Sequence, residues 1–471
     1  MLEALRTGAI SSRELVELHI DRIERFDPNV HAIAVPTFDR AREAAAKADD
    51  ARARGGTGAL LGLPMTLKES TLVAGLPQSA GIPALKGYVP GANGPMARAV
   101  FDAGACLLGK TNIPVALADW QADSPNYPRT NNPWDLGRTP GGSTGGGSAA
   151  LAAGLTPLEV GSDIGGSIRV PAAFCGVYGH RPSETAIPRA GSFPFADGPN
   201  PAQVLSVQGP LARSATDLEL LFDVLVGPEA GEDSAWHLRI PSSRHERLRD
   251  FRVAVMPAFR WASPSTATRE RVDALVEFLG REGARVGEAM PAVDHEEYFR
   301  DYLRMLMVIT TQTMPRAERE REAERMLAAG HPLLAAMGEG HCLDAAALFG
   351  LFDRRERARA AWRAFFREWD VLIGPISLDA AFPHASNPIK EERTLNIDGV
   401  EVPYLLNVVY PMWAIFTGLP STAFPAGRTT GGLPLGLQAI GPYLEDRTTL
   451  RFAQLLEDGW ERFAPPPGYS S

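Results

Sequence analysis

Three residues of this 471-residue chain are of types that together can break an acyl bond. Lys68 ends the apolar run 61–68, and Ser143 and Ser167 each follow a pair of glycines. A serine is a weak nucleophile until a base accepts its proton, and a lysine is such a base only when it is neutral. Burial lowers the pKa of a lysine because it disfavours the charged form. The three residues therefore predict acyl transfer to a serine with a neutral lysine as base, a combination that occurs on unrelated folds.

The glycines before Ser167 predict an oxyanion hole. Glycine lets backbone N–H groups turn towards one point, and such donors stabilise the negative oxygen that forms in acyl transfer. We expect Ser167 to be the nucleophile and Ser143 to relay a proton between Ser167 and Lys68. The expected donors to the oxyanion are the backbone N–H groups of Ile164, Gly165, Gly166 and Ser167.

Each of these segments, taken alone, has a simpler interpretation. A loop rich in glycine and serine is usually a turn, and a lysine at a strand end usually extends its amine to solvent. Neither loop has a phosphate-binding pattern. The histidines form no H-E-x-x-H pattern, and Cys106, Cys175 and Cys342 lack the spacing of a zinc site. The sequence therefore predicts an enzyme with no metal and no cofactor.

The segments around these residues alternate between helix and strand patterns. Residues 11–14 form a capping-box pattern before a helix, and residues 39–54 predict a second helix. Residues 61–68 predict a buried strand. Residues 97–103 predict a helix that stops at a glycine, and residues 105–109 predict another buried strand. This order predicts an α/β fold with a largely buried sheet.

The character of the chain changes between residues 228 and 370. Long helical patterns rich in arginine and glutamate occur there, such as residues 269–280 and 345–366. Strand and turn patterns return at residues 371–375 and 417–437. We expect the region to be either an inserted helical cap or a set of helices on the same sheet. In both cases it is expected to determine which substrates enter.

Several motifs resemble the amidase signature family and follow one another in that family's order over nearly the whole chain. The runs 139–150 and 161–171 resemble the signature itself, and the separation of Ser143 from Ser167 agrees with it. Lys68 lies in a matching Gly-Leu-Pro-x-x-x-Lys-Glu segment. Further matching motifs are residues 109–112, 131–134, 174–177, 417–420, 424–427 and 436–441.

This resemblance implies a fold and a set of roles. The implied fold is a twisted mixed β-sheet of many strands, flanked by helices on both faces, in a single domain of residues 1–471. Lys68 resembles the family's general base, and Ser167 resembles its acylated nucleophile. Ser143 resembles the relay serine, which the family holds through a cis peptide bond.

The resemblance also implies supporting residues, and the sequence departs from the family at two places. Asp163 and Arg169 resemble residues that brace the active-site loops. Thr144 stands where the family usually has a second serine, and because a hydroxyl is kept we expect activity to survive. Residues 182–185 also depart from the family pattern, and we expect them to reshape a loop near the site.

The implied reaction converts a small-molecule amide and water to a carboxylate and an amine or ammonia. The same acyl chemistry serves esters and carbamates (urethanes), so aryl acylamidase, esterase and urethanase activities stay open. Asp119 and Trp120 lie in a stretch that lines the acyl side of the pocket in similar enzymes. We expect both to contact substrate, although Trp120 would suit the core equally well.

The sequence leaves two alternative functions open. The A-type subunit of the tRNA-dependent amidotransferase resembles this chain in its triad and needs a partner chain. Its usual stretch after the motif at residues 110–112 is absent, since residues 118–121 read Ala-Asp-Trp-Gln. The second alternative is a catalytically inactive binding protein on the same fold, which the complete triad disfavours.

Composition limits the partners and the cellular compartment that we expect for this chain. The formal net charge is −9, with no run of like charge, so a nucleic-acid partner is not expected. No apolar run approaches the roughly 20 residues that cross a membrane, and the N-terminal residues lack a signal-peptide pattern. The odd, scattered cysteines favour a reducing compartment, and we expect a cytoplasmic protein. A homodimer is suggested only by the resemblance, and residues 464–471 are expected to be a loose tail.

Overall fold

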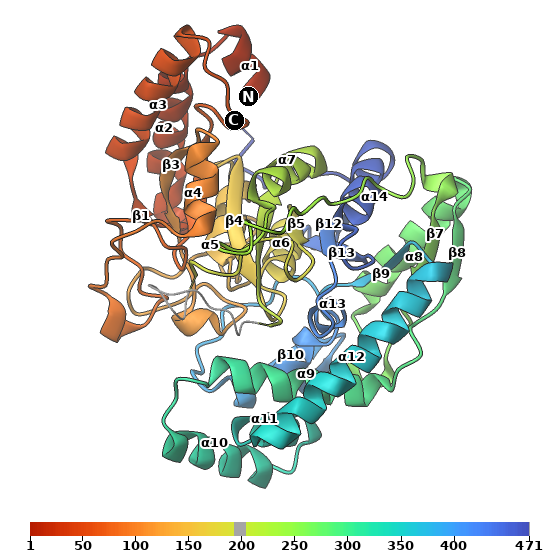
Figure 1. Ribbon diagram of the computed structural model, residues 1–471. Helices are drawn as coiled ribbons and strands as arrows, with labels where there is room; N and C mark the ends of the chain where they lie inside the picture. The colour runs from red at the N-terminus through yellow and green to blue at the C-terminus, as the bar shows by residue number, and fades with distance from the viewer. Residues whose placement is uncertain (193–203, 471) are drawn as a thin grey trace.

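The computed structural model describes residues 1–192 and 204–470. Within them, eleven strands form one mixed sheet in the order β1-β3-β2-β4-β6-β5-β12-β13-β9-β7-β8 (Figure 1). The strands are β1 (Ile33–Pro36), β2 (Pro64–Lys68), β3 (Cys106–Thr111), β4 (Leu158–Asp163), β5 (Tyr178–Arg181), β6 (Val207–Ala212), β7 (Arg252–Val255), β8 (Arg285–Glu288), β9 (Val371–Pro375), β12 (Ser421–Arg428) and β13 (Pro434–Ile440). A separate hairpin consists of β10 (Thr394–Ile397) and β11 (Val400–Pro403).

Helices surround this sheet. They are α1 (Leu2–Thr7), α2 (Ser12–Val30), α3 (Phe38–Ala53), α4 (Pro95–Asp102), α5 (Gly145–Ala152), α6 (Arg169–Cys175), α7 (Ala215–Leu225), α8 (Thr266–Arg281), α9 (His295–Thr310), α10 (Arg316–Ala328), α11 (Pro332–His341), α12 (Ala345–Glu368), α13 (Met412–Ile415) and α14 (Asp446–Gly459). Helices α10 and α11 lie at one end of the molecule, and α1–α3 lie at the other (Figure 1).

Both faces of the sheet are covered, as the alternation along β3 shows. Cys106 and Leu108 pack in a core cluster with residues of α2, α3 and α5. Leu107, between them, packs in a different cluster with residues of α4, α7 and α14. Because successive side chains of a strand point to opposite faces, helices must lie on both sides of the sheet. The predicted α/β fold, a mixed sheet flanked by helices, is confirmed.

The strands near Lys68 run parallel. β2 pairs in parallel with β3 on one side and with β4 on the other. β2 begins only at Pro64, because Gly62, with φ at 79°, turns the chain just before it. β3 continues two residues past the predicted end, since Thr111 still pairs with Lys68. The carboxyl ends of β2 and β4 therefore lie at the same edge of the sheet.

The region 228–370 differs from its prediction as a helical segment. It contains α8 to α12, but β7 and β8 also come from it and form one edge of the sheet. Both strands have only four residues, and those of β8 are exposed or half-buried. Such short strands carry little periodicity, and the surrounding helical patterns obscured them.

The last described residues are better anchored than the predicted loose tail. The ring of Tyr469 lies 5.2 Å from that of Phe26 on α2. The carbonyl of Tyr469 also accepts a hydrogen bond from Arg22. An aromatic contact and a hydrogen bond, both to residues of α2, thus hold the segment. Among the described residues, no helix combines the length and the apolar character that a membrane crossing requires.

A buried ion pair joins α12 to the segment that departs from the family pattern at residues 182–185. Glu184 Oε2 lies 2.5 Å from Arg355 Nη2, and the side chains are 5% and 3% exposed. Glu184 also accepts a hydrogen bond from the N–H of Leu205, at 2.8 Å. A charge buried this deeply is tolerated because it is paired.

We therefore expect Glu184→Ala to lower the free energy of unfolding by about 3–5 kcal/mol, because it leaves the Arg355 guanidinium buried without a counter-charge. The measurement is the thermal unfolding temperature. Glu356→Ala is the matched control, since Glu356 pairs with Arg359 on the same helix while 58% exposed. That change should cost less than about 1 kcal/mol. Equal losses in the two variants would contradict the assignment.

Candidate active site

Lys68 lies at the edge of the sheet where the carboxyl ends of β2 and β4 meet. Lys68 ends β2, and Asp163 ends the parallel neighbour β4. Leu67 packs in the core cluster that contains α4 and α7, so Thr66 and Lys68 face the other side. There Lys68 meets the segment that begins α5, and its side chain is 1% exposed. The prediction that this lysine is buried at the end of an apolar strand is confirmed.

Three hydroxyls surround the amine of Lys68. Its Nζ lies 2.7 Å from Ser143 Oγ, 3.0 Å from Thr144 Oγ1 and 2.9 Å from Ser162 Oγ. Ser162 was not among the site residues expected from the sequence. Glu159 and Gly161 face α5, so strand alternation assigns Ser162 to the opposite face. It contacts Lys68 only because it lies at the end of β4, and no periodic signal could have found it.

Burial controls the charge of this cluster. It lowers the pKa of Lys68 to about 7, against the opposing attraction of the carboxylates of Glu159 and Asp163. Burial also raises the pKa of Glu159 to about 7, and Glu159 accepts a hydrogen bond from Thr111 Oγ1 at 2.7 Å. Burial raises the pKa of Asp163 as well, but the positive charges of Arg169 and Arg181, together with hydrogen bonds from Arg169 and the N–H of Ile168, outweigh it. They hold the pKa of that carboxyl below its usual range. Both the neutral and the charged amine are therefore well populated near pH 7.

The peptide bond between Gly142 and Ser143 is cis. The cis bond was expected only from the family resemblance. A side chain at position 142 would not fit, because a Cβ there would lie 2.4 Å from the carbonyl oxygen of Asp119. Close backbone packing thus requires glycine directly before Ser143.

Ser167 lies beside this cluster without joining it through its hydroxyl. Its backbone carbonyl accepts a hydrogen bond from the N–H of Thr144 at 3.2 Å. Ser143 and Ser167 both line the same cavity. Within residues 1–192 and 204–470, however, no hydrogen bond is formed by the Ser167 hydroxyl, so its predicted hydrogen bond to Ser143 is not present. Catalytic hydrogen bonds often tighten only when substrate is bound.

The turn before Ser167 is held by Asp163. Its carboxylate accepts hydrogen bonds from the N–H of Gly166, at 3.0 Å, and of Ile168, at 3.2 Å. Arg169 pairs with the same carboxylate at 3.0 Å, and both side chains are fully buried. Gly166 has φ at 88°, a conformation that glycine adopts without strain. Asp163 and Arg169 thus occupy the bracing positions expected of them.

The four predicted oxyanion donors are not equivalent. The N–H of Gly166 is already donated to Asp163. The N–H groups of Ile164, Gly165 and Ser167 make no hydrogen bond to any other described residue. Three of the four amides are therefore free to donate to a ligand in this arrangement.

A cavity of about 620 Å³ opens above Ser143 and Ser167. Most of its wall is apolar, and much of it comes from the region 228–370. That apolar wall includes Leu303, Leu306, Met307, Met326, Met337 and Val408. Charged side chains also line it, among them Glu322, Arg325 and Lys390. The cavity therefore suits a molecule that is largely apolar.

Asp119 and Trp120 both line this cavity, as expected for residues that contact substrate. The Asp119 carboxylate is already engaged, 2.7 Å from Arg393 Nη1 and 2.5 Å from the Tyr404 hydroxyl. Trp120 donates its Nε1–H to the carbonyl of Gly165 at 2.9 Å. Trp120 therefore borders both the cavity and the turn before Ser167.

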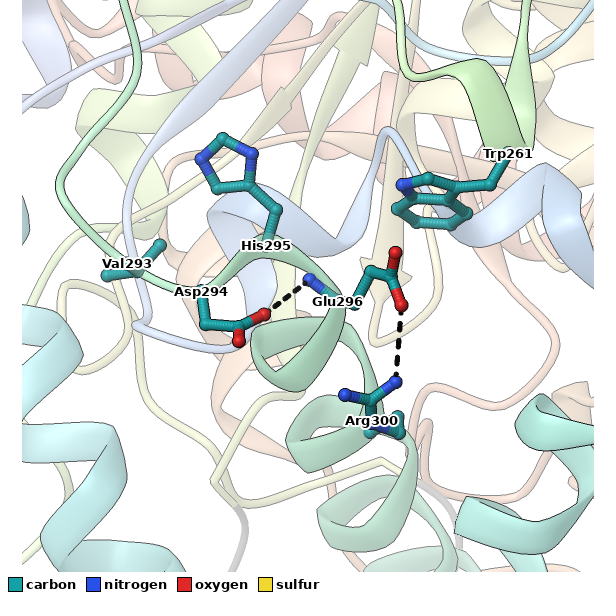
Figure 2. A pocket seen from close by; sticks show the side chains of 6 residues that line it. All are labelled: Trp261, Val293, Asp294, His295, Glu296 and Arg300. Atoms are coloured by element: carbon teal, nitrogen blue, oxygen red, sulfur yellow. Dashed lines mark hydrogen bonds and ion pairs between the residues drawn. The ribbon is translucent and has the colours of Figure 1, made fainter.

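A second cavity, of about 480 Å³, lies at the start of α9 and contains none of the predicted site residues (Figure 2). Its charged groups satisfy one another. Asp294 caps the N–H of Glu296, and Glu296 lies 3.4 Å from Arg300. Among the described residues, no group of three or more histidine, cysteine or acidic side chains is placed to hold a metal ion. The cavity beside Lys68 is thus the candidate active site.

The charge state of Lys68 can be measured directly because lysine is rare in this chain. The lysines are Lys47, Lys68, Lys86, Lys110 and Lys390. In an NMR titration of ¹³C-labelled lysine side chains, we expect two signals to titrate at unusually low pH, that of Lys68 near pH 7 and that of buried Lys110 near pH 8. Only the first should vanish in Lys68→Met. Glu159→Gln should lower the pKa of Lys68 further, because it removes a negative charge that stabilises the ammonium. A Lys68 signal that titrates near 10.5 would refute the assignment.

Comparisons with known proteins place this site in a family. The family model described as Amidase matches residues 14–450. An indoleacetamide hydrolase from Bradyrhizobium diazoefficiens is 31% identical over 94% of this chain and 82% of its own length. The A-type subunit of glutamyl-tRNA(Gln) amidotransferase from Synechococcus sp. (strain CC9605) is 28% identical over 99% of this chain and 96% of its own length. The structure of a bacterial aryl acylamidase, 27% identical, covers 97% of this chain with 95% of its own and a TM-score of 0.79. The chain belongs to the amidase signature family.

Proposed function

We propose that this chain hydrolyses the C–N bond of carboxylic amides through an acyl-enzyme on Ser167. The observation that carries the proposal is the buried amine of Lys68, 2.7 Å from Ser143 Oγ, at the base of a cavity that also contains Ser167. A neutral amine in that place is a base, and the hydroxyl between it and the cavity is a proton relay. The continuous sheet supports treating residues 1–471 as one catalytic unit.

The proposed reaction has two halves. Ser167 Oγ attacks the amide carbonyl while its proton passes to Ser143 and the proton of Ser143 passes to Lys68. The free N–H groups of the 164–167 turn stabilise the oxyanion. The proton then returns through Ser143 to the leaving nitrogen, the C–N bond breaks, and the amine departs. Water repeats these steps on the acyl-enzyme, releasing the carboxylate and restoring Ser167.

The cavity supports amides that carry a bulky apolar group as substrates. Its largely apolar wall would bury such a group, and α9, α10 and α11 supply much of that wall. We therefore propose that the region 228–370 selects the substrate. The names of two relatives point the same way, since indoleacetamide and aryl acylamides both join an amide to an aromatic group. Esters and carbamates of similar shape are proposed as further substrates.

A role within an amidotransferase is the rival in the family, because a relative of that name covers nearly the whole chain. The two functions differ in what they require. A hydrolase needs only the purified chain, whereas the rival needs partner subunits and ATP. The deciding experiment measures kcat/KM of the chain alone, without ATP, on matched amides, anilides, esters and carbamates with aromatic groups. Inactivity on all of them would refute the proposed hydrolase.

Replacement of the proposed nucleophile tests the mechanism. Ser167→Ala should abolish turnover and labelling by a fluorophosphonate probe while leaving the circular dichroism spectrum unchanged. Lys68→Ala should lower kcat nearly as much, because residues that act as a unit are not additive. Labelling that survives in Ser167→Ala would show that another residue is the nucleophile. Absence of labelling in the unaltered chain would favour an inactive binding protein.

The pH dependence follows from Lys68. Because the neutral amine is the proposed base and its pKa is about 7, kcat/KM should be level above that pH and fall about tenfold per unit below it. Glu159→Gln lowers the pKa of Lys68, so the fall should move to lower pH. A rate that increases towards acid pH would exclude a neutral-lysine base.

A further inference from the structure

We propose that Tyr302 is a positioning residue that orients the Gly165 N–H as an oxyanion donor, so that the wall of the substrate cavity also sets the geometry of catalysis. This inference rests on the proposed function. Tyr302 belongs to α9, lines the cavity and is fully buried. Tyr302 was not among the site residues expected from the sequence.

Two consecutive carbonyls of the turn are held by donors from separate parts of the chain. The Tyr302 hydroxyl donates to the carbonyl of Ile164 at 2.9 Å. The Trp120 indole donates to the carbonyl of Gly165, also at 2.9 Å. A trans peptide is planar, so its C=O and N–H point in opposite directions. A donor that holds the carbonyl therefore also fixes where the N–H of the same peptide points.

The two peptides differ in what holds the other end. In the peptide between Gly165 and Gly166, Trp120 holds the carbonyl and Asp163 accepts from the N–H. In the peptide between Ile164 and Gly165, Tyr302 holds the carbonyl, and the N–H has no partner among the described residues. The first peptide keeps its orientation if one contact is lost. The second depends on Tyr302 alone and carries the amide that is free to bind an oxyanion.

Tyr302 is suited to this task. Burial raises the pKa of its hydroxyl, so the group stays protonated and remains a donor. The neighbouring Asp301 pairs with Arg304 at 2.8 Å and with Arg354 of α12 at 2.7 Å, which anchors α9. The space beside Gly165 is filled only loosely, since a Cβ there would lie 3.6 Å from the Tyr302 oxygen. The turn thus has room to rotate if the hydroxyl is removed.

The test compares two tyrosines of the same helix. Tyr298 is also buried, and its hydroxyl donates to the carbonyl of Trp413 at 3.0 Å, away from the turn. We expect Tyr302→Phe to lower kcat on an aryl amide about tenfold or more with KM nearly unchanged, because removing one oxyanion donor costs about 10²–10³ and misorienting it costs less. Tyr298→Phe should leave kcat unchanged even though it costs more thermal stability, because the Tyr298 hydroxyl also pairs with Thr417 Oγ1 and accepts a hydrogen bond from Trp362 Nε1.

A third variant separates positioning from packing. Trp120→Phe removes the donor to the peptide that Asp163 still holds, so its kcat should fall less than that of Tyr302→Phe. The rate of labelling of Ser167 by a fluorophosphonate, whose P=O oxygen would occupy the same hole, should fall in the same order. Equal kcat and labelling rates in Tyr302→Phe and Tyr298→Phe would overturn the inference. An unaltered chain that labels but hydrolyses no amide would instead refute the proposed function alone.

Discussion

The burial of one amine governs the rest of this site. Lys68 extends from the end of a central strand into a space closed by protein, where three hydroxyls replace the water that would otherwise solvate it. A charged ammonium is costly there, and the neutral form is favoured. Hydroxyls can accept from the ammonium and can either donate to or accept from the neutral amine, so they satisfy both forms without fixing the charge. A carboxylate in direct contact would instead have kept it protonated.

The surrounding charges follow from this constraint. Glu159 and Asp163 lie close enough to attract the ammonium, yet each carboxylate is engaged elsewhere. Thr111 donates to Glu159, and Arg169 neutralises Asp163. The Asp163 carboxylate consequently accepts hydrogen bonds from the backbone N–H groups of Gly166 and Ile168, which shape the turn around Ser167. The buried ion pair of Asp163 and Arg169 thus weakens the attraction of Asp163 for the Lys68 ammonium and also holds the turn before Ser167.

The helical region connects substrate selection with this centre. Its apolar side chains form much of the cavity wall, and Tyr302 of the same wall reaches the carbonyl of Ile164. Glu184 joins the region to the sheet through Arg355 of α12. Helix α9 therefore contacts the turn before Ser167, and two strands of the same region, β7 and β8, belong to the sheet.

Much of this could be predicted from the sequence because local pattern determines it. Short apolar runs next to glycines predicted β2 and β3, and the glycine pairs before Ser143 and Ser167 marked these serines as candidate site residues. The resemblance to the amidase signature family indicated that these serines share one site with Lys68, which their spacing along the chain alone could not establish. The short strands β7 and β8 were missed, since four residues carry too little periodicity to be recognised.

What the sequence alone determined is which segments are buried and where the chain must turn, because these depend on residues close together along it. Only the tertiary structure decided that Ser162 contacts Lys68 and that Asp163 accepts the N–H of Gly166. It also decided that Tyr302 donates a hydrogen bond to the carbonyl of Ile164, 138 residues away. Contacts of that range arise from how elements pack on the sheet. Neither the spacing nor the type of a residue specifies which distant group it will meet.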